Sequence, residues 1–120
     1  MKIGVLGLAE THWIGNGKEV TEEGWEIYYS GGQKRYAGVG LLIRRGIKEA
    51  VTEVRPVNDR VILARLDAKP RPMNIIQVYL PTTAAEEEEV KDVYTKIQKE
   101  IDEIPKRERL VIRSEVIKIM

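Results

Sequence analysis

The first apolar segments of the chain are short and rich in residues that favour strands. Residues 3–8 (IGVLGL) form an apolar run with two glycines, as a buried strand does. Residues 25–29 (WEIYY) are aromatic and β-branched, and residues 36–45 (YAGVGLLIRR) resume the apolar run after the turn residues 30–35. We therefore expect a strand followed by a β-hairpin. Residues 11–24 are expected to form a loop, because glycine, asparagine and charged residues interrupt the pattern.

The middle of the chain predicts three more strands. Residues 51–54 and 60–68 are the first two, with residues 55–59 between them, and the second alternates so that one face is more apolar. Residues 69–72 (KPRP) predict a turn, because two prolines in four residues cannot carry a ladder of hydrogen bonds. Residues 73–80 (MNIIQVYL) then predict a third strand.

One helix is predicted in the last third of the chain. Thr83 can cap it, and Glu86 completes a capping box three residues later. The acidic run 86–89 opens this helix, where it favours the N-terminal partial charge rather than a metal site. Residues 110–112 (LVI) begin another strand, so we expect an α+β layout with the helix on a mostly antiparallel sheet. Helical spacing places six apolar side chains on one stripe: Val90, Val93, Tyr94, Ile97, Ile101 and Ile104.

Composition and charge narrow the classes of protein. A chain of 120 residues suits one modest domain. The formal net charge of +1 argues against a broad basic field for nucleic acid, so any such contact would come from a local patch. The chain has no cysteine, which excludes disulfides and thiolate metal sites. No apolar run approaches the roughly 20 residues of a membrane span. We expect a soluble intracellular domain, nuclear or cytoplasmic, with no membrane partner.

A polar cluster follows the first predicted strand, in the stretch GLAETHWIG at residues 7–15. From its residue type alone, Glu10 is more readily a solvated carboxylate at a strand end than a functional group. His12 is the only histidine, and without cysteines a zinc site is not expected there. The glycine-rich segment 30–40 precedes a strand rather than a helix, which favours a hairpin turn over a phosphate-binding loop.

Four segments occur in an order that resembles a known superfamily: LGLAETHW, AGVGLLI, NIIQVYLPTT and RLVI. The chain resembles the endonuclease/exonuclease/phosphatase superfamily from about residue 4 to 112. The resemblance is strongest to the endonuclease domain of non-LTR retrotransposons and to craniofacial development protein 2-like sequences. It implies a four-layer α/β sandwich, with two sheets packed face to face and helices outside, of which residues 1–120 would be a single partial domain.

The resemblance also implies a chemistry, the Mg²⁺-dependent hydrolysis of DNA phosphodiester bonds. Glu10 matches the family's metal-binding glutamate, and Tyr79 matches an aromatic residue that contacts the scissile phosphate. Mg²⁺ takes oxygen ligands and neutralises charge on phosphoryl oxygens, which explains a carboxylate at this position. His12, Lys34 and Arg35 are weaker candidates for contact with the substrate, as are Arg44 and Arg45.

The chain departs from the family pattern in ways that argue against activity. The family has an asparagine-bearing strand before the "ET" strand, and a later Ser-Asp-His segment that supplies the general base, and neither is present here. Where the family reads LVIGDFN, this chain reads LVIRSEV, with Arg113, Ser114 and Val116 in place of Gly, Asp and Asn. We expect a truncated domain with weak or no activity. The alternative is a non-catalytic half-domain that binds a partner, or itself, through a sheet face left open.

Overall fold

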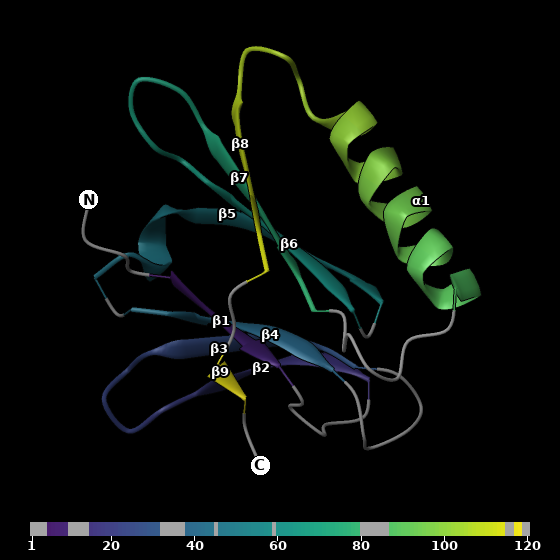
Figure 1. The fold of residues 1–120 in the computed structure, drawn as a ribbon. Coiled ribbons are helices and arrows are strands. Elements are labelled where there is room, and N and C mark those ends of the chain that lie inside the picture. The colour runs from purple at the N-terminus through teal and green to yellow at the C-terminus, as the bar shows by residue number, and fades with distance from the viewer. Residues whose placement is uncertain are drawn as a thin grey trace.

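The computed structural model of the chain describes residues 5–9, 15–31, 38–44, 46–58, 60–79, 87–114 and 117–118. These residues form two β-sheets stacked face to face, with one helix on the outer face of the second sheet (Figure 1). The first sheet has five strands, in the order β2 (Asn16–Val20), β3 (Glu26–Ser30), β4 (Val39–Ile43), β1 (Val5–Ala9) and β9 (Ile117–Lys118). The second has four strands, in the order β5 (Val51–Asn58), β6 (Val61–Leu66), β7 (Met73–Val78) and β8 (Arg109–Arg113).

The five-stranded sheet confirms the predicted hairpin and corrects the predicted loop. β3 pairs with β4 in antiparallel register, and β4 pairs with β1. Residues 16–20, which we expected in a loop, form β2 and pair with β3. The strand escaped prediction because its sequence, NGKEV, has no apolar alternation, and because most of its side chains are exposed at the sheet edge. The short strand β9 runs parallel to β1 and was also not predicted.

The four-stranded sheet is antiparallel except for its last pair, β7 and β8, which run parallel. β5 continues to Asn58, although residues 55–59 were expected to separate two strands. The strand accommodates Pro56 because β5 is an edge strand, where a missing N–H need not interrupt a ladder on both sides. Residues 67–72 connect β6 to β7, as the proline pair predicts.

The helix α1 (Glu87–Glu103) covers the outer face of the four-stranded sheet (Figure 1). Val93 and Ile97 are buried there against β6 and β7, and Ile101 and Ile104 are partly buried, as the predicted stripe requires. Tyr94 was expected in that stripe but is 63% exposed, because it lies on the flank of the helix rather than beneath it. The capping residues at 83 and 86 lie outside the described residues. A 3-10 turn, η1 (Lys48–Ala50), precedes β5.

The main core lies between the two sheets. It joins buried side chains of both sheets: Val5, Ala9, Val39, Leu41, Ile43, Ile62, Ala64, Leu66, Ile75 and Tyr79. The chain is thus an α+β sandwich of two mostly antiparallel sheets and one helix, as expected. The two sheets pack against each other through this core, so the fully open inter-sheet face that we expected of a half-domain is not found in the described residues. Within the same residues, no helix is long and apolar enough to cross a membrane.

Candidate functional site

The carboxyl ends of β1 and β7 lie at the same end of the sandwich. In the five-stranded sheet, Ala9 at the end of β1 pairs with Val39, which pairs with Ser30 at the end of β3. In the four-stranded sheet, the ends of β5 and β7 both pair with Val61 at the start of β6. The Ser30 hydroxyl joins the two ends by donating a hydrogen bond to the carbonyl of Asn58. The last residues of β1 and β7, Ala9 and Val78, therefore lie at one common end of the sandwich, and Tyr79 follows there.

Tyr79 lies directly after β7 and is 7% exposed. Its backbone N–H donates to the carbonyl oxygen of Arg60 at 2.9 Å, which holds it beside the β5–β6 turn. That turn is closed by the N–H of Arg60, which donates to the Asn58 side chain at 2.8 Å. The ring of Tyr79 belongs to the core between the sheets, in the same cluster as Ala9. Its packing role is therefore established, and its contact with a phosphate stays a prediction.

Most of the other predicted site residues, Glu10, His12, Lys34, Arg35 and Arg45, lie outside the described residues. Ala9, the last described residue before position 10, is fully buried. Arg44 is described: it follows β4, whose last residue Ile43 pairs with Val5 at the start of β1, so it lies at the opposite end of the sandwich from Ala9 and Tyr79. The predicted metal and substrate roles of these residues stay predictions.

A polar link between the sheets was missed by the sequence analysis. Gln77 is fully buried on the inner face of β7, directly against Gly7 of β1. Arg113, at the end of β8, donates from Nη1 to the carbonyl of Val5 at 2.9 Å and from Nε to Gln77 at 3.3 Å. Nε2 of Gln77 donates in turn to the carbonyl of Arg113 at 3.3 Å. The signal was present as a glutamine inside the apolar run IIQVYL, but an amide in a strand is more often exposed.

Ionisable groups gather elsewhere, in a cavity of about 290 Å³ between the four-stranded sheet and the helix. Arg65 donates to both carboxylate oxygens of Glu108, at 2.8 and 3.0 Å, and Asn74 donates to the same carboxylate at 3.1 Å. The Arg65 guanidinium, followed by the Asn74 amide, lowers the pKa of Glu108 from its ordinary 4.5 to about 2. These groups lie on the helix side of the sheet, away from the end of β1, and their pairing indicates a structural role.

A second group of charges ties β5 to the helix. Arg55 donates from Nη1 to Glu100 at 2.7 Å and to Glu103 at 3.1 Å, and from Nη2 to Glu53 at 3.1 Å. Hydrogen bonds to Glu53 and then Glu100 raise the pKa of Arg55, so it remains a cation. Across the part of the chain that the structure describes, no three His, Cys, Asp or Glu side chains are arranged to hold a metal ion.

The sequence of the chain is similar to that of a curated protein from two species. No family model matches the chain. It is 37% identical over 113 residues, 93% of its length, to craniofacial development protein 2 of Bos taurus, and 36% identical over 113 residues to that of Tragulus javanicus. The chain spans about a fifth of the length of these relatives, 19% and 20% respectively. The chain is therefore similar, along nearly its whole length, to one segment of craniofacial development protein 2.

Proposed function

We propose that the chain is one part of a magnesium-dependent phosphodiesterase domain of retrotransposon origin that acts on DNA, and that on its own it has little nuclease activity. The observation that carries the proposal is the convergence of β1 and β7 at one end of the sandwich. Tyr79 lies at this end, and Glu10 follows Ala9 of β1 in the sequence; these are the two positions that match the superfamily's phosphate-contacting and metal-binding residues. Ligand sites in layered α/β proteins commonly form outside the carboxyl ends of strands.

The donors in this chain fit Mg²⁺ poorly. This ion is usually held by one or two carboxylates together with substrate phosphates and water, and here Glu10 is the one ligand that the resemblance supplies. Position 113 carries an arginine instead of the family's glycine, and its guanidinium bridges the two sheets. These features support weak or absent catalysis by the 120-residue chain.

A plasmid-nicking assay tests the proposal. Supercoiled plasmid is incubated with the chain and Mg²⁺, in parallel with Glu10→Ala and with full-length Bos taurus craniofacial development protein 2. We expect no nicking by the chain above the level of Glu10→Ala, and Mg²⁺-dependent nicking by the longer relative. Nicking by the chain that disappears in Glu10→Ala would contradict its inactivity. Failure of the longer protein to nick would contradict the phosphodiesterase assignment.

A non-catalytic binding module is the second candidate function. It is favoured by apolar side chains that the fold leaves open: Leu110, Val111 and Ile112 follow one another on the edge strand β8 and are 37%, 37% and 50% exposed. Contiguous exposed apolar side chains mark interaction surfaces in soluble proteins. The plasmid assay also separates the two candidates, since a pure binding module would not nick DNA in the longer protein either.

A further inference from the structure

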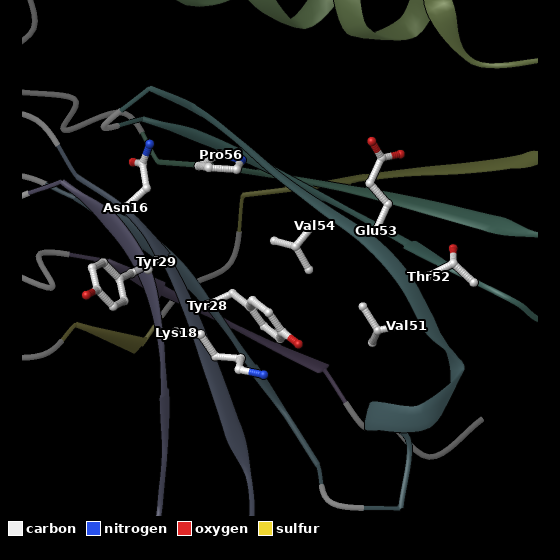
Figure 2. Close-up of a pocket in the computed structure, with 10 residues that line it drawn as sticks. Asn16, Lys18, Tyr28, Tyr29, Val51, Thr52, Glu53, Val54 and Pro56 are labelled. Atoms are coloured by element: carbon white, nitrogen blue, oxygen red, sulfur yellow. The ribbon is translucent and has the colours of Figure 1, made fainter.

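The two sheets differ in width, and this leaves a ledge at one side of the sandwich. β3 packs over β5 and β6, so β2, which is one strand further out, extends past the edge of the four-stranded sheet. A groove of about 410 Å³ lies between this overhang and β5 (Figure 2). Residues of β2 and β3 line one wall of the groove, and residues of β5 line the other. The ledge is as wide as one strand.

The groove is apolar at its centre and polar at its rim. Tyr28 of β3 and Val54 of β5 point into it from opposite walls, whereas Glu53 lines its rim and turns its carboxylate toward the other face of β5 (Figure 2). Tyr28 and Val54 are partly buried and pack against the core between the sheets. The Lys18 ammonium lies 5.7 Å from the centre of the Tyr28 ring and 3.4 Å from Glu26, so its charge has a partner already. The wall on the β2 side therefore favours apolar contact over a charged ligand.

The backbone of β5 can accept another strand on this side. β5 is an edge strand, and its pairing with β6 uses one side only. Pro56 lies opposite Ile62 and has no N–H to donate. The two residues therefore form a non-hydrogen-bonded pair of the antiparallel ladder. Alternation along the strand then directs the N–H and C=O of Val54 to the free edge. These two groups can hold an added strand at the centre of the groove.

The other face of β5 carries a negative charge. Three carboxylates, those of Glu53, Glu100 and Glu103, pair with the guanidinium of Arg55. Arg65, opposite Glu53 in the ladder, is itself paired with a fourth carboxylate, that of Glu108, so carboxylates outnumber guanidinium groups on this face. Glu53 and Glu103 are the accessible ones, with side chains 46% and 51% exposed. A strand added to β5 would place every second side chain on this face, beside Glu53. Basic side chains there would balance the charge.

We propose that the free edge of β5 binds an extended peptide segment in which apolar and basic side chains alternate. The apolar side chains would enter the groove beside Tyr28 and Val54, and the basic ones would lie beside Glu53. A second copy of the chain does not fit this edge. A two-fold β5–β5 pair would bring both overhanging β2 strands over the same shared edge, where they would collide. A single strand from another protein meets no such obstacle.

The test uses the synthetic peptide Ac-Val-Lys-Val-Lys-Val-Lys-Val-NH2 and the ¹⁵N-labelled chain. We expect titration to shift the amide resonances of β5 and to slow hydrogen exchange of the Val54 N–H. Glu53→Lys should weaken binding about fivefold or more, because it replaces an attractive cross-strand pair by a repulsive one. Glu88→Lys makes the same charge change at an exposed position on the helix and should leave the affinity unchanged. Thermal unfolding of both variants confirms that they are folded.

Two altered peptides test the chemistry without changing the protein. A peptide with glutamate in place of lysine should bind more weakly, because it meets the carboxylates of Glu53 and Glu103. A peptide N-methylated at its valines should not bind, because the valines lie on the same face as Val54 and turn their N–H groups toward β5. The proposal is overturned if the lysine peptide does not bind, or if Glu53→Lys leaves its affinity unchanged. It is also overturned if Ile112→Lys on β8, rather than Glu53→Lys, abolishes binding.

Discussion

At the scale of single residues, Glu108 gives the stability of the fold a defined dependence on pH. Arg65 and Asn74 hold its pKa near 2, below its ordinary 4.5, so the folded state favours the charged form. The stabilisation is present above pH 4.5 and is lost as the pH falls toward 2, because the unfolded chain takes up the proton first. We expect the melting temperature to fall over this range, and less steeply in Glu108→Gln.

Thermal unfolding followed by circular dichroism between pH 6 and pH 2 measures this effect. Glu22→Gln, at an exposed turn, is the matched control and should retain the slope of the wild-type protein. Equal slopes in Glu108→Gln and the wild-type protein would mean that the Arg65 pair does not contribute to acid sensitivity.

Gly7 is a second residue whose identity is fixed by one contact. A Cβ at this position would overlap the side-chain amide of Gln77, which is fully buried and linked to Arg113. The amide cannot move without losing these hydrogen bonds, so Gly7→Ala should lower the free energy of unfolding by about 1–3 kcal/mol. Urea denaturation measures the loss.

Two further variants identify the cause. Gly46→Ala should be nearly neutral, because a Cβ there meets no atom within 4 Å. In the Gln77→Ala background, Gly7→Ala should cost much less than it does alone, because the overlapping amide has gone. Additive costs would show that Gly7 is required for another reason.

At the scale of elements, the sequence pattern identified the segments that carry an apolar run and failed at two polar edge strands. The strands that became β1, β3, β4, β6, β7 and β8, and the helix, were predicted, because each contains a run or stripe of apolar residues. β2 was not predicted, because an edge strand can be polar throughout. β5 was predicted to end before Pro56, although a proline does not interrupt a strand at an edge. The spacing of apolar residues also did not show that Tyr94 lies on the exposed flank of the helix, because it does not mark where the buried face of the helix ends.

The attachment of the helix to the sheet depends on Arg55 as well as on apolar contact. This side chain holds Glu100, whose side chain is only 7% exposed, and the more exposed Glu103. Arg55→Leu would leave a buried carboxylate without its partner, so we expect a loss of about 1–3 kcal/mol in the free energy of unfolding. The value lies below that of a fully buried pair because Arg55 is itself 38% exposed.

Chemical denaturation of three variants separates charge from packing. Glu103→Gln, which removes an exposed partner, should cost less than Arg55→Leu. The double variant Arg55→Leu/Glu100→Leu should recover part of the loss, because it removes the buried charge along with its partner. If the double variant is no more stable than Arg55→Leu, the cost comes from lost packing of the arginine side chain.

At the scale of the whole molecule, the candidate site was predicted from the resemblance to a known superfamily and not from the pattern of apolar and polar residues. Nothing in the periodicity indicated that β1 and β7, some 70 positions apart in the sequence, end side by side. That arrangement depends on stacking of two sheets, which is a long-range property. The Arg113–Gln77 link was missed for the same reason, since its partners come from β1, β7 and β8.

The two edges of the four-stranded sheet predict different behaviour in solution. β5 carries charges and a proline, which are common protections against uncontrolled pairing, whereas β8 exposes Leu110, Val111 and Ile112 in succession. We therefore expect self-association through β8. In size-exclusion chromatography with light scattering, the mass should rise above 13.7 kDa as concentration increases. Ile112→Lys should remain closer to that mass, because a charge on the edge opposes pairing.

Val20→Lys is the matched control for this prediction. Val20 is 57% exposed on β2, so the substitution adds the same charge and removes a similar exposed apolar surface at another edge. If exposed apolar area in general drove association, Val20→Lys and Ile112→Lys would lower the mass equally. If β8 is the pairing edge, only Ile112→Lys will do so. A wild-type chain that stays at 13.7 kDa at every concentration would contradict both, and would show that three exposed apolar side chains on a five-residue strand are too few to hold two copies together.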